Sequence, residues 1–447
     1  MPESFVGRLG QCVELPMPAG RLLIVGCGEI VEDGETTFWE AAGAAVMDSL
    51  RMSKIDHAAL SGELLPMRIE HAAAARCFAM GATLASYRCD RYRKLPPKDH
   101  FAVQSLALHA GDWNASADAR AQADAVNWAR ALVEAPANLL NPQTFAAEIQ
   151  SLSAFGIEIE VLDAAELERI GAGGLLAVGR SSANPPCLVI CRWQGDKKRK
   201  RHDLGLVGKG LTFDAGGLNL KTAPGIAKMR LDMGGAAAVV GALRAMAARK
   251  APVNVVAALP LCENLIDGEA YRPGDVITSL SGLTIEVDNT DAEGRIVLAD
   301  GISYLISAYK PRLLVDVATL TGAMMMSLLE EYAGLFTADD ALAQSLETAG
   351  NTCNELLWRM PLSKLQDYVV DSDIADVKNV GAPGLFGVGG SSIAGAKFLE
   401  RFASGTRWAH IDIAGTAWST RPRTGVARGA TGYGVRLIDA FVDRLPD

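Results

Sequence analysis

Short apolar runs and helical patterns alternate along the first third of the chain. Residues 22–26 read LLIVG and predict a buried strand, and residues 101–108 predict another. Residues 38–52 and 68–87 carry apolar residues at helical spacing, the second stretch with many alanines, and predict two helices. We therefore expect this third to form a small α/β unit. It contains no cluster of candidate catalytic residues.

A longer helical pattern separates this unit from the rest. It covers residues 117–132 and ends close to Pro136, as expected for a helix that connects two domains. We place the boundary within it, which gives an N-terminal domain at residues 1–125 and a catalytic domain at residues 126–447.

Strand and helix patterns alternate throughout the second domain. Strands are predicted at residues 157–162, 187–193, 204–208, 252–259, 313–319 and 408–413. Helices are predicted between them at residues 236–249, 292–308 and 391–402. Several strands are apolar on both faces, which is typical of a sheet covered by helices on each side. The expected fold class is α/β, with a small N-terminal α/β domain and a larger mixed-sheet domain flanked by helices.

The charge balance bears on the class of partner. The chain of 447 residues carries a net charge of −9, which disfavours a dedicated nucleic-acid-binding protein. One basic run, KKRKRH at residues 197–202, matches a nucleic-acid patch or a nuclear signal. Because it lies between two predicted strands, we favour a solvated hairpin loop.

The sequence predicts a cytoplasmic protein without a membrane partner. The N-terminus lacks a positive region followed by an apolar run, so no secretory signal is expected. No apolar stretch reaches the ~20 residues needed to cross a bilayer. The eight cysteines form no C-x-x-C pair and are expected to be reduced thiols.

Candidate chemistry is concentrated in residues 207–295. Four carboxylates, those of Asp214, Asp232, Asp291 and Glu293, are flanked by glycine, alanine and apolar residues. These neighbours predict burial, and buried carboxylates must be paired or bind metal. All four fall at predicted strand ends or helix starts, where ligands bind in open α/β sheets.

The carboxylates favour a two-metal site. Four neighbouring negative charges repel one another strongly, and two divalent ions supply a matching charge. Oxygen ligands suit Mn or Mg and tolerate Zn. The chain has no H-E-x-x-H motif, and its six histidines show no metal-ligand spacing, so a histidine-based zinc site is not expected.

Several segments in this order resemble the leucyl aminopeptidase family (peptidase M17, cytosol aminopeptidase). The most specific is NTDAEGR at residues 289–295. The further matching segments are residues 179–186, 207–217, 229–235, 317–323, 408–418 and 429–434. The resemblance covers roughly residues 126 to 447.

The resemblance implies roles for individual residues. One metal ion would be bound by Asp214, Asp291 and Glu293, and the other by Lys209, Asp214, Asp232 and Glu293. Lys221 would polarise the scissile carbonyl, and Arg295 would hold a bicarbonate ion acting as general base. The pocket for the first side chain would be lined by Met229, Thr319, Gly322, Ala414 and Ala417.

The resemblance also implies a function and an assembly. It predicts a hydrolase that releases neutral or aliphatic N-terminal residues, such as leucine, from peptides through a water nucleophile that bridges two metals. The metals would be Mn or Zn, with Mg and Co as alternatives. The implied assembly is a homohexamer, and the implied N-terminal domain is macro-like.

Elementary chemistry supports the implied roles. A lysine ligand must be neutral, although free lysine titrates near ~10.4, and burial beside two dications would lower its pKa. Lys221 and Arg295 can remain cationic and stabilise an oxyanion and a bound anion.

Three alternatives remain at this point. A two-metal phosphohydrolase could use the same acids, although Gly208, Lys209 and Gly210 lack the spacing of a phosphate-binding P-loop. A DNA-binding protein would have basic residues clustered on one face near the run at residues 197–201, and an affinity that depends on salt. A catalytically inactive relative would have lost some of the seven ligand and catalytic residues, all of which are present.

Overall fold

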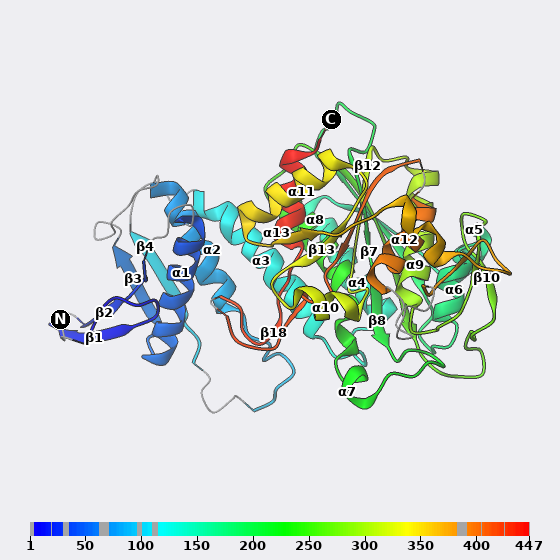
Figure 1. Ribbon diagram of the computed structural model, residues 1–447. Coiled ribbons are helices and arrows are strands. Elements are labelled where there is room, and N and C mark those ends of the chain that lie inside the picture. Colours follow the sequence, from blue (N-terminus) through cyan, green and yellow to red (C-terminus); the bar gives the residue numbers. More distant parts are fainter. Residues whose placement is uncertain are drawn as a thin grey trace. The chain divides into compact units, whose positions relative to one another are not determined.

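The structure is a computed structural model, and it divides the chain into two compact units (Figure 1). It describes residues 4–18, 20–29, 35–61, 71–95, 101–109, 115–381, 391–403, 405–423 and 425–446. The first unit comprises Met1–Asn127 and Ser419–Gly429, and the second comprises Trp128–Trp418 and Ala430–Asp447. Within the described residues, no helix is both long and apolar enough to cross a membrane.

The first unit is built on two closely packed helices. Its elements are β1 (Cys12–Met17), β2 (Gly20–Val25), α1 (Glu35–Met52), β3 (His57–Ser61), α2 (His71–Ser86), β4 (Ser105–His109) and the start of α3 (Ala115–Glu134). The β1 and β2 strands pair antiparallel, and β3 pairs with β4 in parallel. A Cβ atom at Gly43 would lie 2.1 Å from the carbonyl oxygen of Phe78, so glycine is required where α1 meets α2. The predicted small α/β unit is confirmed.

A nine-stranded mixed sheet forms the centre of the second unit. The strand order is β14-β13-β16-β12-β7-β9-β6-β5, and β8 pairs with the far end of β9. The bounds are β5 (Glu158–Leu162), β6 (Cys187–Gln194), β7 (Leu204–Gly208), β8 (Gly210–Asp214), β9 (Asn254–Asn264), β12 (Leu313–Ala318), β13 (Ala333–Phe336), β14 (Leu357–Arg359) and β16 (Arg407–Asp412). The strands β16, β12, β7 and β9 run parallel, whereas β5, β6 and β13 introduce antiparallel pairs.

Helices cover both faces of this sheet, as the doubly apolar strands predict (Figure 1). A Cβ atom at Gly208 would lie 2.6 Å from Cα of Ala236 in α8 (Gly234–Ala248). The preceding residue, Val207, faces Gly301 in α9 (Glu293–Ala308). Because successive residues of a strand point to opposite faces, α8 and α9 lie on opposite sides of the sheet.

Shorter elements complete this unit. The remaining helices are α4 (Pro142–Gln150), α5 (Ala164–Ile170), α6 (Gly173–Gly179), α7 (Ala223–Ile226), α10 (Gly322–Leu328), α11 (Asp340–Cys353), α12 (Ser391–Phe402) and α13 (Val435–Phe441). The 3-10 turns are η2 (Ser151–Phe155), η3 (Met229–Leu231), η4 (Lys364–Val370) and η5 (Val442–Arg444). Strands β10 (Val276–Thr278), β11 (Thr284–Glu286) and β15 (Val377–Lys378) form a small sheet. Two-residue strands β17 (Trp418–Ser419) and β18 (Gly429–Ala430) lie where the chain passes between the units.

The basic run at residues 197–201 lies in an exposed loop, but this loop is not a hairpin. The flanking strands β6 and β7 are separated in the sheet by β9, so the prediction of a hairpin was wrong. Arg199 forms ion pairs with Asp196 at 2.6 Å and Asp203 at 2.8 Å. The side-chain amide of Asn254 donates to the carbonyls of Asp196 and Arg199. The loop therefore has an ordered structural role, and one of its cations is already paired.

Candidate metal centre and active site

The carboxyl ends of five neighbouring strands meet at one edge of the large sheet. The strands β7, β9, β12 and β16 are parallel to one another, and β8 is parallel to β9. The residues that end or directly follow these strands are Lys209, Asp214, Asn264, Thr319 and Asp412. Parallel order alone therefore places polar side chains from distant parts of the sequence at a common edge.

Lys209 lies at the break between β7 and β8 and is almost completely buried. Its Nζ atom is 2.7 Å from Oδ2 of Asp232 and 2.9 Å from Oε1 of Glu293. It also donates to the carbonyl of Thr319 at 3.1 Å. Burial alone would lower the pKa of Lys209, but the carboxylates of Asp232, Glu293 and Asp214 outweigh it and hold the pKa above its usual value. Lys209 is thus a buried cation that joins two of the predicted ligands.

Asp214 is the last residue of β8 and points into the same cluster. Its Oδ1 atom accepts hydrogen bonds from the backbone of Gly216 and the amide of Asn264, both at 2.8 Å. Its Oδ2 atom lies 2.8 Å from Nζ of Lys221, which also contacts Oδ1 of Asp291. The Lys221 side chain is 17% exposed, so this second cation is reachable from solvent.

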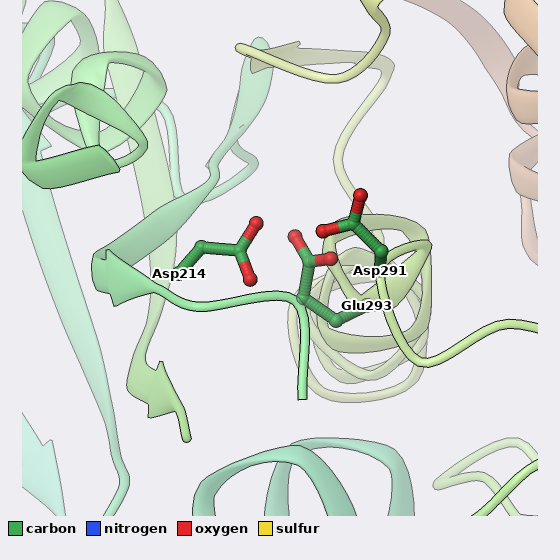
Figure 2. Close-up of side chains that lie close together, drawn as sticks. All are labelled: Asp214, Asp291 and Glu293. Carbon is green, nitrogen blue, oxygen red and sulfur yellow. The ribbon is translucent and has the colours of Figure 1, made fainter. Parts of the chain in front are cut away.

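Asp291 and Glu293 approach Asp214 from the start of α9 (Figure 2). One oxygen from each of these three carboxylates lies within 4.8 Å of the others. Figure 2 shows the three groups converging from a strand end, a loop and a helix start. The Oε2 atom of Glu293 is buried and has no hydrogen-bond partner among the described residues. Three converging acids with an unsatisfied oxygen fit a bound cation.

Asp232 joins the cluster through Lys209. It follows the short turn η3, and its Oδ1 atom accepts a hydrogen bond of 2.8 Å from the hydroxyl of Thr319. Burial raises the pKa of Asp232 to about 6, against the opposing charge of Lys209. Burial and the neighbouring Glu293 also raise the pKa values of Asp214 and Asp291. These raised pKa values indicate that ionised carboxylates are energetically unfavourable at this site unless cations neutralise their charge.

Arg295 lies two residues after Glu293 in the first turn of α9 and is buried. Burial lowers its pKa to about 10, while the charges of Glu293 and Asp412 oppose the shift. Its Nε atom is buried and makes no hydrogen bond within the described part of the chain. A buried guanidinium with an unused donor fits an anion site.

The five predicted pocket residues lie on three segments. Met229 begins the turn η3, Thr319 follows β12, and Gly322 begins α10. Ala414 and Ala417 belong to the turn that follows β16. A Cβ atom at Gly234 would lie 3.4 Å from Cγ2 of Thr319 and 3.6 Å from Cβ of Ala417, so these two segments meet beside the start of α8.

Sequence reasoning missed the residues that hold the ligands in place. The amide of Asn264 donates both to Asp214 and to the carbonyl of Thr290, 3.0 Å away. Thr319 was predicted only as a pocket residue, yet it bonds Asp232 and Lys209. Asn264 ends a long apolar strand directly after Glu263, and this polar pair at the strand end was a usable signal.

The residues fit a pair of divalent cations. All four carboxylates and Lys209 belong to one connected, mostly buried cluster, and oxygen atoms dominate its donors. The ammonium groups of Lys209 and Lys221 cancel half of the charge of the four carboxylates. The sequence-based charge balance counted the carboxylates and the two divalent ions but not these lysines. Two negative charges therefore remain while Lys209 is protonated, and loss of its proton on metal binding would leave three.

Comparison with known proteins shows the family of this chain. The model of the cytosol aminopeptidase family, catalytic domain, matches residues 127–438, and that of the N-terminal domain of this family matches residues 3–96. The probable cytosol aminopeptidase of Methylobacterium radiotolerans is 43% identical over 98% of this chain and 87% of its own length. That of Caulobacter vibrioides is 42% identical, with 98% and 88% covered.

A solved structure extends the likeness to three dimensions. The bottromycin maturation enzyme BotP in complex with Mn has a TM-score of 0.89 and 37% sequence identity, covering 98% of this chain and 94% of BotP. The expected recognition and fold class are thereby confirmed. By sequence over nearly its full length and by fold, the chain belongs to the cytosol aminopeptidase family, whose name describes a hydrolase of peptide N-termini.

Proposed function

We propose that this chain is a two-metal aminopeptidase that releases neutral, mainly aliphatic residues such as leucine from peptide N-termini. The observation that carries the proposal is the connected cluster of Lys209 and four carboxylates at the carboxyl edge of the sheet. Family membership supports the reaction class, and the cluster supports its metal dependence.

The two cations would share ligands. Asp214, Asp291 and Glu293, which already converge within 4.8 Å, would hold one. Lys209, Asp214, Asp232 and Glu293 would hold the other, with Lys209 as a neutral amine. Mn or Zn is proposed, with Mg and Co as alternatives, and the Mn complex of the similar BotP supports Mn. Bound divalent ions supply a water nucleophile near neutral pH by lowering the water pKa from ~15.7 towards ~7.

The chain's own residues would perform the remaining tasks. Lys221, a cation with a partly exposed side chain, would stabilise the oxyanion that forms when the scissile carbonyl is attacked. Arg295 would hold bicarbonate, because its planar guanidinium binds oxyanions through two parallel hydrogen bonds. Held there, the anion would supply general-base chemistry beside the proposed metal site.

The first side chain of the substrate would occupy a pocket between Met229, Thr319, Gly322, Ala414 and Ala417. These residues offer apolar groups and little charge, so an aliphatic side chain would be favoured over a charged one. The meeting of Thr319 and Ala417 beside Gly234 supports two walls of this pocket.

A metal-exchange experiment tests this function. The protein is stripped with a chelator, its metal content is checked by elemental analysis, and Mn, Zn, Co or Mg is returned. Turnover is then measured on a panel of aminoacyl amides and on a phosphate monoester. We expect stripping to abolish amide hydrolysis and a divalent ion to restore it. Full activity without metal would refute the proposal, and hydrolysis of the phosphate ester alone would favour the phosphohydrolase alternative.

Location and assembly form a separate part of the proposal. We propose a cytoplasmic homohexamer with peptides as substrates and no nucleic-acid partner. The name of the curated relatives supports the location. Cell fractionation tests the location, and analytical ultracentrifugation tests whether the particle is six times the chain mass of 47.2 kDa. DNA binding that weakens steeply with salt would contradict the absence of a nucleic-acid partner.

A further inference from the structure

A buried aspartate connects two segments that follow neighbouring strands. Asp412 is the last residue of β16 and is 1% exposed. Its Oδ1 atom accepts hydrogen bonds from the backbone nitrogens of Leu320 and Ala414, each at 3.1 Å. Its Oδ2 atom accepts a bond of 2.7 Å from the hydroxyl of Thr321. One carboxylate thus holds both the chain leaving β12 and the chain leaving β16.

These two segments carry four of the five proposed pocket residues. Thr319 and Gly322 flank the residues that bond Asp412 on the first segment. Ala414 itself bonds Asp412, and Ala417 lies three residues further along the second segment. Thr319 and Ala417 both lie beside Gly234, so the two segments are neighbours there and would form two walls of the proposed pocket. The distance between these walls decides how large a side chain fits between them.

Backbone pairing does not hold the walls together. The parallel pairing of β12 with β16 ends at Ala318 opposite Asp412, followed by one bond of 2.8 Å from the nitrogen of Ile413 to the carbonyl of Ala318. Beyond it, no backbone hydrogen bond joins residues 319–322 to residues 414–417, all of which are described. Beyond the last backbone hydrogen bond, the carboxylate of Asp412 joins the two segments.

A second buried hydrogen-bond network joins β12 and β16 before they reach Ala318 and Asp412. Asp316 of β12 lies opposite His410 of β16, and its Oδ1 atom is 2.6 Å from Nδ1 of His410. Its Oδ2 atom accepts a bond of 2.7 Å from the indole of Trp408. This network fixes the two strands up to Asp412, so Asp412 extends from a rigid base.

We propose that Asp412 is a positioning residue that sets selectivity for the first substrate side chain by holding the two pocket walls at a fixed separation. This inference rests on the proposed function, since the pocket residues are assigned there. Asp412 makes no described hydrogen bond to the predicted ligands, and it holds the pocket segments through Leu320, Thr321 and Ala414. Its charge also acts on Arg295, so the test uses the ratio of kcat/KM values between substrates, which a general loss of turnover leaves unchanged.

The test compares variants that remove all or some of the three hydrogen bonds that Asp412 accepts. Asp412→Ala removes all three bonds, Asp412→Asn keeps one oxygen for the two backbone donors, and Thr321→Val removes only the hydroxyl bond. The kcat/KM values for leucyl, alanyl and glycyl amides are measured at saturating metal, with metal content and folding checked. In Asp412→Ala we expect the preference for leucine over glycine to fall about tenfold or more, because a pocket discriminates single methylenes by roughly 10–200-fold. Smaller losses are expected in the other two variants.

Asp300→Ala is the matched control. Asp300 is a fully buried aspartate that accepts backbone bonds of 2.8 Å from Leu175 and Leu280, in segments without site residues. The Asp300→Ala variant should lose thermal stability while keeping the wild-type ratio of kcat/KM for the leucyl amide to kcat/KM for the glycyl amide. A purely structural role for Asp412 predicts this same result for Asp412→Ala.

The outcomes separate the two proposals. A folded Asp412→Ala variant with the wild-type ratio overturns the inference. If that variant does not fold, wild-type ratios in both Asp412→Asn and Thr321→Val overturn it. A wild-type protein that releases no N-terminal residue overturns the proposed function, and the inference with it.

Discussion

The Nζ atom of Lys209 lies 2.7 Å from Oδ2 of Asp232, within the cluster of carboxylates itself. This ammonium group also contacts Glu293 at 2.9 Å, so it links an acid proposed to bind one metal with an acid proposed to bind both. A cation that takes Lys209 as a ligand must displace its proton. Because Asp232 is proposed to bind one cation and Glu293 both, replacement of these two residues should remove different amounts of metal.

Asp232→Ala should remove one metal ion per chain, whereas Glu293→Ala should remove both. Asp232 is proposed to contact a single metal, while Glu293 is proposed to bridge the two. Elemental analysis after dialysis against low metal measures the difference. Asp300→Ala, a buried aspartate outside the cluster, should retain the wild-type content. Equal metal content in the Asp232 and Glu293 variants would reject the assignment of ligands.

Lys221→Ala should lower kcat roughly 10²–10³-fold, the usual effect of removing one donor to a developing oxyanion. KM should change less, because the interaction strengthens only as charge develops on the carbonyl. Steady-state kinetics on a leucyl amide measures both constants. Lys228→Ala removes an exposed lysine on the other side of α7 and serves as the control. Normal turnover with only a raised KM would contradict the proposed role.

Arg295→Ala should cost turnover while leaving both metal positions filled. Arg295→Lys should recover little, because an ammonium group lacks the planar pair of donors. Wild-type turnover should fall when carbonate is rigorously removed and recover when bicarbonate is returned, whereas neither variant should respond. Indifference of the wild type to bicarbonate, together with full turnover in Arg295→Ala, would place the general base elsewhere.

Glu355 should make folding stability fall as pH rises from about 4.5 to about 7. Burial raises its pKa from 4.5 to about 7, so the folded state binds this proton more tightly than the unfolded state does. The stabilisation is complete below the unfolded pKa and is lost as pH rises through the folded pKa. Its size is roughly 3 kcal/mol, at 1.36 kcal/mol for each unit of pKa.

Glu355→Gln tests this effect. Both backbone donors, Gly434 at 2.9 Å and Leu437 at 2.8 Å, bond the same oxygen, which a glutamine carbonyl can replace. Denaturant titrations between pH 5 and pH 8 should show a flatter profile for the variant than for the wild type. Parallel profiles would show that Glu355 does not titrate in this range.

The apolar pattern of the sequence determined the main elements and the fold class. The predicted strands at residues 204–208 and 313–319 correspond to β7 (Leu204–Gly208) and β12 (Leu313–Ala318), and the helix at 292–308 corresponds to α9 (Glu293–Ala308). Long buried segments repeat apolar residues with a clear period, and the pattern is local information. The ordered motifs likewise determined the family, because they record residue identity directly.

Other elements depend on packing that the local pattern does not reveal. Helix α6 (Gly173–Gly179) has the sequence GGLLAVG, whose glycines disfavour a helix. It forms where a Cβ atom at Gly174 would lie only 2.9 Å from the side chain of Ile296, so close contact with α9 requires the glycine. Strand β13 (Ala333–Phe336) is a four-residue apolar run, too short to be distinguished from a loop without its partner β16.

The features of the candidate site were likewise only partly predictable from the sequence. Burial of Asp214, Asp232 and Glu293 followed from their apolar and glycine neighbours, but the same argument was wrong for Asp291, whose side chain is 33% exposed. The alternation of elements predicted that the four acids lie at strand ends or close to helix starts. Only the tertiary structure decided that Lys209 pairs with Asp232 and Glu293, that Lys221 pairs with Asp214, and that Asp412 joins the segments that follow β12 and β16. These relationships join residues separated by up to 92 positions, as for Leu320 and Asp412. Strand order and register set them, and both depend on long-range packing that a single sequence does not specify.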